Sequence, residues 1–301
     1  MFQSFSQIEK YVLDNKVIKK IALAGSHDPD ALSSVVSAKR KGVITACLIG
    51  DVEKTRELLK QMNEPEEGYQ FIHEPVGALA AHIACGMVKA GEADMPMKGK
   101  MITADFVRAV LDKQYEFISP GGLLCQATVL EFTEENRFMI ISDCAVNVEP
   151  DYAAKKIILQ NAVSLAHKLG ISCPKVAVIA PLELVNPKIQ ATIDAALLSK
   201  AADRGQITGC IVDGPLAVDN AVSAEAAEAK GIGGTVAGHA DILIMPDLCA
   251  GNAFTKSLHY FAHLHQSGCV TGVNIPIVMT SRTDSPEDKY YSILVAMMQS
   301  L

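Results

Sequence analysis

The chain has 301 residues, of which 49% are hydrophobic, and a formal net charge of −7 at pH 7. This length accommodates one large or two medium domains with a substantial core. The acidic balance disfavours nucleic acid as a partner, and no apolar stretch reaches the ~20 residues that a membrane span needs. The eight cysteines are scattered without a C-x-x-C pair, which is typical of free thiols in a cytoplasmic protein rather than of disulfides or a zinc site.

Short apolar runs alternate along the chain with segments of helical spacing. This alternation predicts an α/β fold in which mostly parallel sheets carry helices on both faces. One exception is a polar turn at 133–136 between two strand-like runs, which predicts an antiparallel hairpin. The expected strands are 20–25, 44–50, 93–99, 124–132, 137–143, 175–180, 207–214, 240–247 and 275–281.

No repeat, low-complexity tract or flexible linker separates domains. A second domain must therefore connect through ordinary strands, and the hairpin is the place where the parallel rhythm breaks. We expect one α/β domain from residues 1–131 plus 275–301 and another from residues 132–274.

Polar clusters follow many of the expected strands. Ligands of parallel sheets gather at the carboxyl ends of strands, so these clusters predict one composite site, although any α/β protein has polar loops there. The clusters are Ser26–Asp28, Lys98–Lys100, Asp213–Pro215, Asp247–Asn252 and Ser281–Arg282.

The segment TSRTDSPED at 280–288 combines a helix start with reactive side chains. Ser285 as N-cap, a proline and two acids are typical of a first helical turn, and capping alone explains Ser285 and Asp288. Capping does not explain Ser281 and Arg282, which stand at the strand end. Arginine suits phosphate, and a nearby carboxylate, Asp288 or Asp284, can act as a general base.

A second candidate cluster is cationic. Lys98 and Lys100 flank Gly99 at a strand end, and Arg108 follows on the next helix. The three can bind an anion, or they are solvated surface cations.

Three further residues are candidates for substrate contacts. Asp213 is expected to end a strand before a Gly-Pro turn, where turn chemistry is the alternative. Gly251 and Asn252 are expected at a helix start, whose free N–H groups suit phosphate, while a simple cap is equally compatible. The histidines lack an H-E-x-x-H pattern, so no metal site is expected.

Six segments, in this order, resemble the phosphate acetyl/butyryltransferase family, and the butyryl-type branch more than the acetyl-type. The match covers nearly the whole chain. The segments are MKGKMITADFVRAVL, DCAVNVEPDYAAKKIILQNAV, CPKVAVIAPLELVNPK, IVDGPLAVDNAVS, AGHADILIMPDLCAGN and IVMTSRTDSPEDKYYSI.

The resemblance implies transfer of a short-chain acyl group, butyryl first, from coenzyme A to inorganic phosphate. It also implies two α/β domains around a cleft, like the isocitrate and isopropylmalate dehydrogenases, a homodimer or higher homo-oligomer, and no cofactor beyond the substrates. The catalytic serine and arginine fall on Ser281 and Arg282, the base on Asp288, and a phosphate- or coenzyme A-binding arginine on Arg108. The family's Ser-His pair reads Cys125-Gln126 here.

Three alternatives remain at this point. One is a phosphate acetyltransferase acting on acetyl-CoA. Another is a metal- and nicotinamide-dependent dehydrogenase of the same architecture, for which Asp213 and Asp219 offer few ligands. The third is a non-catalytic module that binds acyl-CoA.

Overall fold

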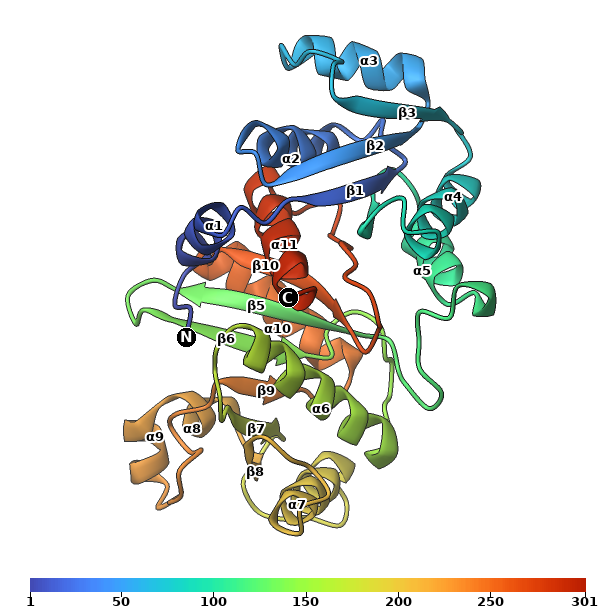
Figure 1. Cartoon of the computed structure of the whole chain (residues 1–301). Helices are drawn as coiled ribbons and strands as arrows, with labels where there is room; N and C mark the ends of the chain where they lie inside the picture. Colours follow the sequence, from blue (N-terminus) through green and yellow to red (C-terminus); the bar gives the residue numbers. More distant parts are fainter. The chain divides into compact units, whose positions relative to one another are not determined.

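The computed structural model describes all 301 residues, which form two compact units. The terminal unit consists of Phe5–Gly121 and Ser267–Leu301, and the central unit of Met1–Ser4 and Gly122–Gln266. Both contain alternating strands and helices (Figure 1). Their breaks precede the expected domain boundaries, because both strands of the predicted hairpin lie in the central unit. The division into two domains at residues 131 and 274 stays a prediction.

The terminal unit is built on a parallel four-stranded sheet of order β3-β2-β1-β4. The prediction missed β3, an edge strand whose side chains are only partly buried, so that it lacks a continuous apolar run. The strands are β1 (Lys19–Ala24), β2 (Ile44–Gly50), β3 (Tyr69–His73) and β4 (Met95–Lys98).

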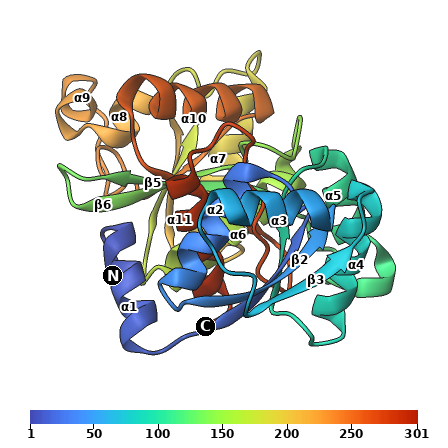
Figure 2. The same ribbon diagram turned by 90° about the horizontal axis from the view of Figure 1, so that it is seen from above.

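The helices of this unit follow from the strand order. The chain moves from β1 outward to β2 and β3 through α2 (Pro29–Arg40) and α3 (Val52–Gln61), which lie next to each other (Figures 1 and 2). It then returns through α4 (Gly77–Lys89) to β4, on the other side of β1. Right-handed crossovers place α4 on the opposite face of the sheet. The reversal makes the carboxyl ends of β1 and β4 a topological switch point.

The terminal unit also contains elements that lie outside its four-stranded sheet. These are α1 (Phe5–Asp14), α5 (Thr103–Val110), the 3-10 helix η1 (Lys113–Tyr115), β10 (Gln266–Thr271), of which Gln266 is counted with the central unit, and α11 (Pro286–Gln299). The predicted helix start is confirmed, because the Ser285 side chain accepts a hydrogen bond from the Asp288 N–H. α11 packs against α2 and α1. Of the strand expected at 275–281, the structure keeps one parallel bridge, between Val278 and Met97 of β4.

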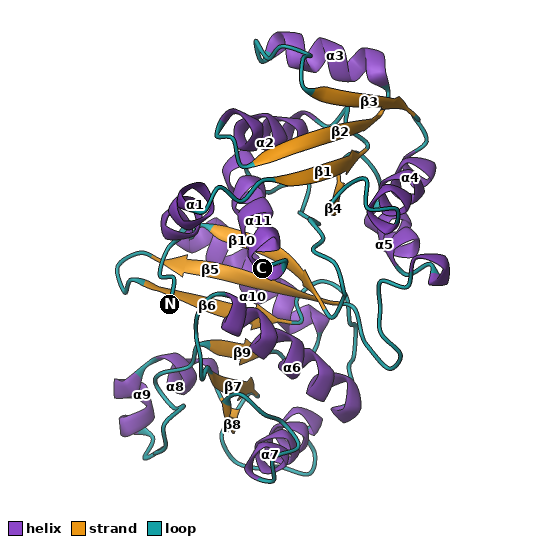
Figure 3. Ribbon diagram, viewed as in Figure 1, coloured by secondary structure: helices purple, strands orange, loops and turns teal.

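The central unit contains the predicted hairpin, in which β5 (Cys125–Phe132) pairs antiparallel with β6 (Arg137–Ser142). Within this unit the strands follow the order β5-β6-β9-β7-β8, and the pairs from β6 to β8 are parallel (Figure 3). The predicted fold class is therefore confirmed. The other elements are α6 (Tyr152–Lys168), β7 (Lys175–Ile179), α7 (Gln190–Asp203), β8 (Ile211–Leu216), α8 (Val218–Val222), α9 (Ala224–Ala229), β9 (Ile242–Ile244) and α10 (Leu248–Ala262).

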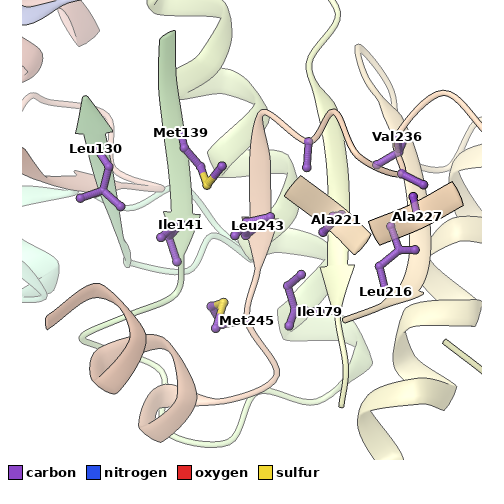
Figure 4. Packing of buried hydrophobic residues seen from close by; sticks show 13 residues of the cluster. Leu130, Met139, Ile141, Ile179, Leu216, Ala221, Ala227, Val236, Leu243 and Met245 are labelled. Carbon is purple, nitrogen blue, oxygen red and sulfur yellow. The ribbon is translucent and has the colours of Figure 1, made fainter. Parts of the chain in front are cut away.

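The core of the central unit uses both faces of this sheet. Met139 and Ile141, two residues apart on β6, belong to one buried cluster together with Leu243 of β9 (Figure 4). Phe254 of α10 packs against this cluster. Ile140 lies between them and points to the opposite face, because neighbouring strand residues alternate, and α6 packs on β6 there. Burial on both faces explains why these strands read as continuous apolar runs.

A buried ion pair joins α6 to α7. Lys155 Nζ lies 2.6 Å from Asp194 Oδ2, and the two side chains are 6% and 4% exposed. Gln190 donates a second hydrogen bond to the other carboxylate oxygen, at 2.8 Å. Both charges are thus compensated within the protein.

We predict that Lys155→Met lowers the free energy of unfolding by about 3–5 kcal/mol, because it leaves the buried Asp194 carboxylate without its counter-charge. The double variant Lys155→Met/Asp194→Leu should lose less, since no buried charge remains. Urea denaturation of both proteins measures the difference. A double variant that is less stable than the single one would contradict the prediction.

Candidate functional site at the β1–β4 switch point

Three polar segments predicted for the site meet at the carboxyl ends of the terminal unit's strands. The N–H of Gly99 donates to Ala24 O at 2.7 Å and that of Lys100 to Gly25 O at 2.9 Å, so the loop after β4 lies along the loop after β1. On the other side of β4, the Lys98 N–H donates to Val278 O at 2.9 Å. The chain that leaves Val278 reaches Ser281 three residues later. The structure therefore brings residues 26–28, 98–100 and 281–282 to one edge of one sheet.

Glycine makes this close approach possible. A Cβ on Gly99 would lie 2.4 Å from Gly25 O and 2.8 Å from Ala24 O, far inside contact distance. Gly25 itself has φ 72°, a backbone conformation that residues other than glycine rarely adopt. The two loops can therefore approach this closely only because residues 25 and 99 are both glycine.

The Ser281–Asp284 loop is held by contacts to its own backbone. The Ser281 N–H donates to Asp284 Oδ2 at 2.7 Å. The ammonium of Lys289, on α11, donates to Ser281 O at 3.0 Å and to Asp284 O at 2.5 Å. Arg282 is exposed and donates to Met101 O at 3.4 Å. The loop thus presents a partly exposed serine hydroxyl and an exposed guanidinium on a backbone tied to a helix.

Lys289 was missed by the sequence reasoning. It is only 2% exposed, although lysine is rarely buried. A signal was available, because Lys289 precedes Ile293 by four residues and so lies on the apolar face of the predicted helix.

Asp288 makes the contacts of a helix-cap residue. It is 3% exposed, its N–H donates to Ser285 Oγ at 3.0 Å, and the Ser285 hydroxyl donates to Asp288 Oδ2 at 2.8 Å. Of the two roles expected for Asp288, these contacts favour the cap. Its role as a general base stays a prediction.

Lys98 is buried among other charges at this edge. It is 4% exposed, and the only hydrogen bond of its side-chain ammonium, to Gly99 O, is 3.5 Å long. Burial lowers the pKa of the Lys98 amine; Asp28 acts in the opposite direction, as Asp284 does, while Arg282 and Lys289 lower the pKa further. None of the ion pairs in the structure includes Lys98, so its charge has no close counter-ion.

His27 lies in the loop after β1, beside this cluster. Its Nδ1 accepts a hydrogen bond from the Asp51 N–H at 3.2 Å, which leaves Nε2 to carry the ring proton. Burial lowers the pKa of His27, and the charge of Lys100 lowers it as well. At neutral pH the ring is therefore a neutral hydrogen-bond donor.

Arg108 is not joined to this group by any contact. It occupies the last turn of α5, its side chain is 70% exposed, and its guanidinium pairs with Asp105 at 2.7 Å. Lys100 is also exposed. The prediction that Arg108 and Arg282 share one anion stays untested by these contacts.

The predicted position of Asp213 was wrong. β8 continues through Gly214 and Pro215 to Leu216, so Asp213 lies within the strand instead of ending it. Its Oδ1 accepts a hydrogen bond from the Gly214 N–H at 2.8 Å. The Gly-Pro pair suggested a turn, but this edge strand accommodates it.

The predicted helix start at Gly251 and Asn252 was also misplaced. α10 begins at Leu248, and its N-cap Asp247 accepts from the Ala250 N–H at 2.8 Å, which puts a negative charge where an anion was expected. A Cβ on Gly251 would lie 2.4 Å from Asp143 O, and Asn252 donates to the carbonyl of Cys144 at 3.1 Å. Both residues pack α10 against the loop after β6, within the central unit.

No three His, Cys, Asp or Glu side chains come close enough together to hold a metal ion. The structure also has no helix with the length and apolarity needed to cross a membrane.

Residues 69–297 match the family described as phosphate acetyl/butaryl transferase. The chain belongs to this family. It is 41% identical to the phosphate butyryltransferase of Clostridium acetobutylicum, over 99% of this chain and 98% of that protein. It is 39% identical to the phosphate acetyltransferase of Thermotoga maritima, over 92% and 94% of the two chains. The predicted family is thereby confirmed.

Solved structures agree with the fold. A branched-chain phosphotransacylase from Enterococcus faecalis superimposes with a TM-score of 0.82 at 29% identity, covering 93% of this chain and 98% of the other. A putative 4-hydroxythreonine-4-phosphate dehydrogenase from Salmonella typhimurium gives 0.59 at 14% identity, over 94% and 99% of the chains, which shows the fold alone. A dehydrogenase-like fold was the expectation.

One departure from the family pattern has a clear chemical consequence. Cys125, which the family resemblance places at the position of a serine, is buried, and burial raises the pKa of its thiol to about 12. Its thiol donates to Leu123 O. Cys125 is therefore a neutral packing residue.

We predict that Gly99→Ala destabilises the protein by about 1–3 kcal/mol, because the new methyl group meets two backbone oxygens that cannot move independently. Gly86→Ala is the matched control. Gly86 lies inside α4, and no atom lies within 4 Å of the place that an alanine methyl group would occupy, so alanine should stabilise the helix by up to about 1 kcal/mol. Thermal denaturation compares the two variants, and equal melting temperatures would contradict the close contact.

Proposed function

We propose that this protein transfers a short-chain acyl group, butyryl first, between coenzyme A and inorganic phosphate, forming an acyl phosphate and free coenzyme A. Family membership supports this activity. The structural observation that supports it best is that the cations of Arg282 and Lys289 at the switch point donate to carbonyl groups instead of carboxylates. A phosphate dianion would supply the missing counter-charge.

We propose different tasks for the neighbouring side chains. Arg282, exposed at the edge, is the guanidinium that binds phosphate through paired donors. Ser281 donates a hydrogen bond from its hydroxyl to the thioester carbonyl oxygen as phosphate attacks, which stabilises the tetrahedral oxyanion. The Ser281 hydroxyl lies 3.1 Å from the Thr283 hydroxyl, which orients it in the free protein.

Asp284 and Asp288 act on the loop itself. Asp284 fixes the Ser281 backbone N–H, and Asp288 fixes the first turn of α11. A catalytic serine held this way needs less reorganisation in the transition state. The alternative role for either carboxylate is that of a general base.

More distant substrate contacts complete the proposal. Exposed Arg108 and Lys100 offer charges for the phosphates of coenzyme A. We also propose that substrate contacts the central unit at Asp213, Gly251 and Asn252. We also propose a homo-oligomer in the cytoplasm that needs no cofactor beyond its substrates, and the unpaired state of all eight cysteines supports this location.

Thiol release from acetyl-, propionyl-, butyryl- and branched acyl-CoA, with and without phosphate, tests the activity. We expect phosphate-dependent release that is fastest with butyryl-CoA and unaffected by a chelator. Fastest release from acetyl-CoA would instead indicate a phosphate acetyltransferase. Binding of acyl-CoA without release would indicate a non-catalytic module, and a requirement for added metal and nicotinamide would favour the dehydrogenase alternative.

Two single variants test the assigned roles. Ser281→Ala should lower kcat about 10²–10³-fold, because it removes one donor to the oxyanion. Arg282→Lys keeps the charge but loses the paired donors, so the KM for phosphate should rise while the KM for acyl-CoA stays near the wild-type value. Wild-type values for both variants would contradict the placement of the reaction at this loop.

Asp288→Asn separates the two roles of Asp288. If it is a cap residue, the variant loses about 0.5–2 kcal/mol of stability and keeps most of its turnover. We expect this result, given the contacts to Ser285. A fall in turnover of about 100-fold or more (what a general base contributes) with unchanged stability would show that Asp288 is the base.

A further inference from the structure

The site still lacks a group that moves the proton which the reaction requires. Hydrogen phosphate must lose its proton to become an acyl phosphate dianion, and the departing coenzyme A thiolate must gain one. Asp284 and Asp288, the carboxylates expected to do this, already accept hydrogen bonds from Ser281 N–H and the Ser285 hydroxyl. A group with an uncommitted titrating atom at the same edge is a better candidate.

Lys98 has the required placement. Its backbone N–H pairs with the strand segment that leads to Ser281, and its nitrogen has a single hydrogen bond at the long limit of 3.5 Å. It is nine-tenths buried, and Arg282 and Lys289 are near enough to repel its positive charge. Lys289, by contrast, donates hydrogen bonds to the carbonyl groups of Ser281 and Asp284 and thereby holds their loop in place.

We propose that Lys98 is the proton-transfer residue of the acyl transfer, cycling between neutral amine and ammonium while substrate is bound. This inference rests on the proposed function. It gives a role to a lysine that the sequence indicated only as one of several anion contacts.

The step balances without any further reactant. A phosphate oxygen attacks the thioester carbon, and the proton of hydrogen phosphate passes to the neutral amine of Lys98. The tetrahedral intermediate collapses with cleavage of the carbon–sulfur bond, and the Lys98 ammonium gives the proton to sulfur. The products are acyl phosphate dianion and coenzyme A thiol, with no net uptake or release of protons.

The charges around Lys98 make this cycle accessible near neutral pH. Burial lowers the pKa of Lys98, and the charges of Arg282 and Lys289 lower it further. Asp28 in the loop between β1 and α2 raises it, as does Asp284 in the Ser281–Asp284 loop. A lowered pKa means that the neutral amine is already populated below the usual range for lysine. Phosphorolysis should therefore rise with pH up to the lowered pKa of Lys98 and then level off.

Lys98→Arg distinguishes proton transfer from anion binding. Arginine keeps the positive charge but does not release its proton, so we expect kcat to fall by about 100-fold or more, the KM for phosphate to change less than about threefold, and the rise with pH to disappear. Lys60→Arg, on exposed α3, is the matched control and should retain wild-type kinetics. If Lys98→Arg keeps kcat within about fivefold, Lys98 only binds the anion and the inference is overturned.

An independent measurement does not depend on how well the variant works. In wild-type protein with 13C-labelled lysine side chains, the Lys98 Cε resonance, identified by its absence in Lys98→Arg, should titrate at lower pH than the exposed lysines. Titration together with the exposed lysines would overturn the inference even if the variant is inactive. If wild-type protein releases no thiol from acyl-CoA and phosphate, the proposed function fails and the inference with it. An active wild type with an undisturbed Lys98 variant refutes the inference alone.

Discussion

The hydrogen bond from the Gly99 N–H to Ala24 O sets the geometry on which the proposed site depends. It joins the loops after β1 and β4 where the strand order reverses, and it forms only because Gly99 has no side chain to collide with Gly25. Lys98 directly precedes this contact, so its position follows from the same constraint. A larger residue at position 99 would part the two loops and shift the buried amine with them.

The main electrostatic feature of the proposed site is a group of neighbouring basic side chains. Lys98 and Lys289 are buried near the exposed Arg282, although burying charge is costly. The backbone compensates part of this cost, since Lys289 donates to two carbonyls of the loop that carries Ser281. In the proposed function, a bound phosphate dianion supplies the counter-charge, so part of the stability is traded for substrate binding.

Much of this could be predicted from the sequence, but with characteristic failures. Strand–helix alternation, the hairpin and the Ser285 cap are local patterns, and the structure has them. Asp213 and Asn252 were misplaced because Gly-Pro and Gly-Asn pairs resemble turns and helix starts, whereas sheet pairing and the Asp247 cap decided otherwise. The helical spacing places Lys289 on the apolar face of the predicted helix, but its contacts to the carbonyl groups of Ser281 and Asp284 are tertiary and could not be predicted from that spacing.

The segments that form the proposed site lie far apart in the chain, which affects the order in which they can fold. The loop after β1 precedes the central unit in the chain, whereas Ser281 and α11, which complete the terminal unit, follow it. The central unit, which lies almost entirely between them in the chain, is fully translated before its neighbour can close. Because pairing across such a sequence separation is entropically slow, we expect the edge of β4 that pairs with Val278 to form its contacts late in folding, after both segments have been translated.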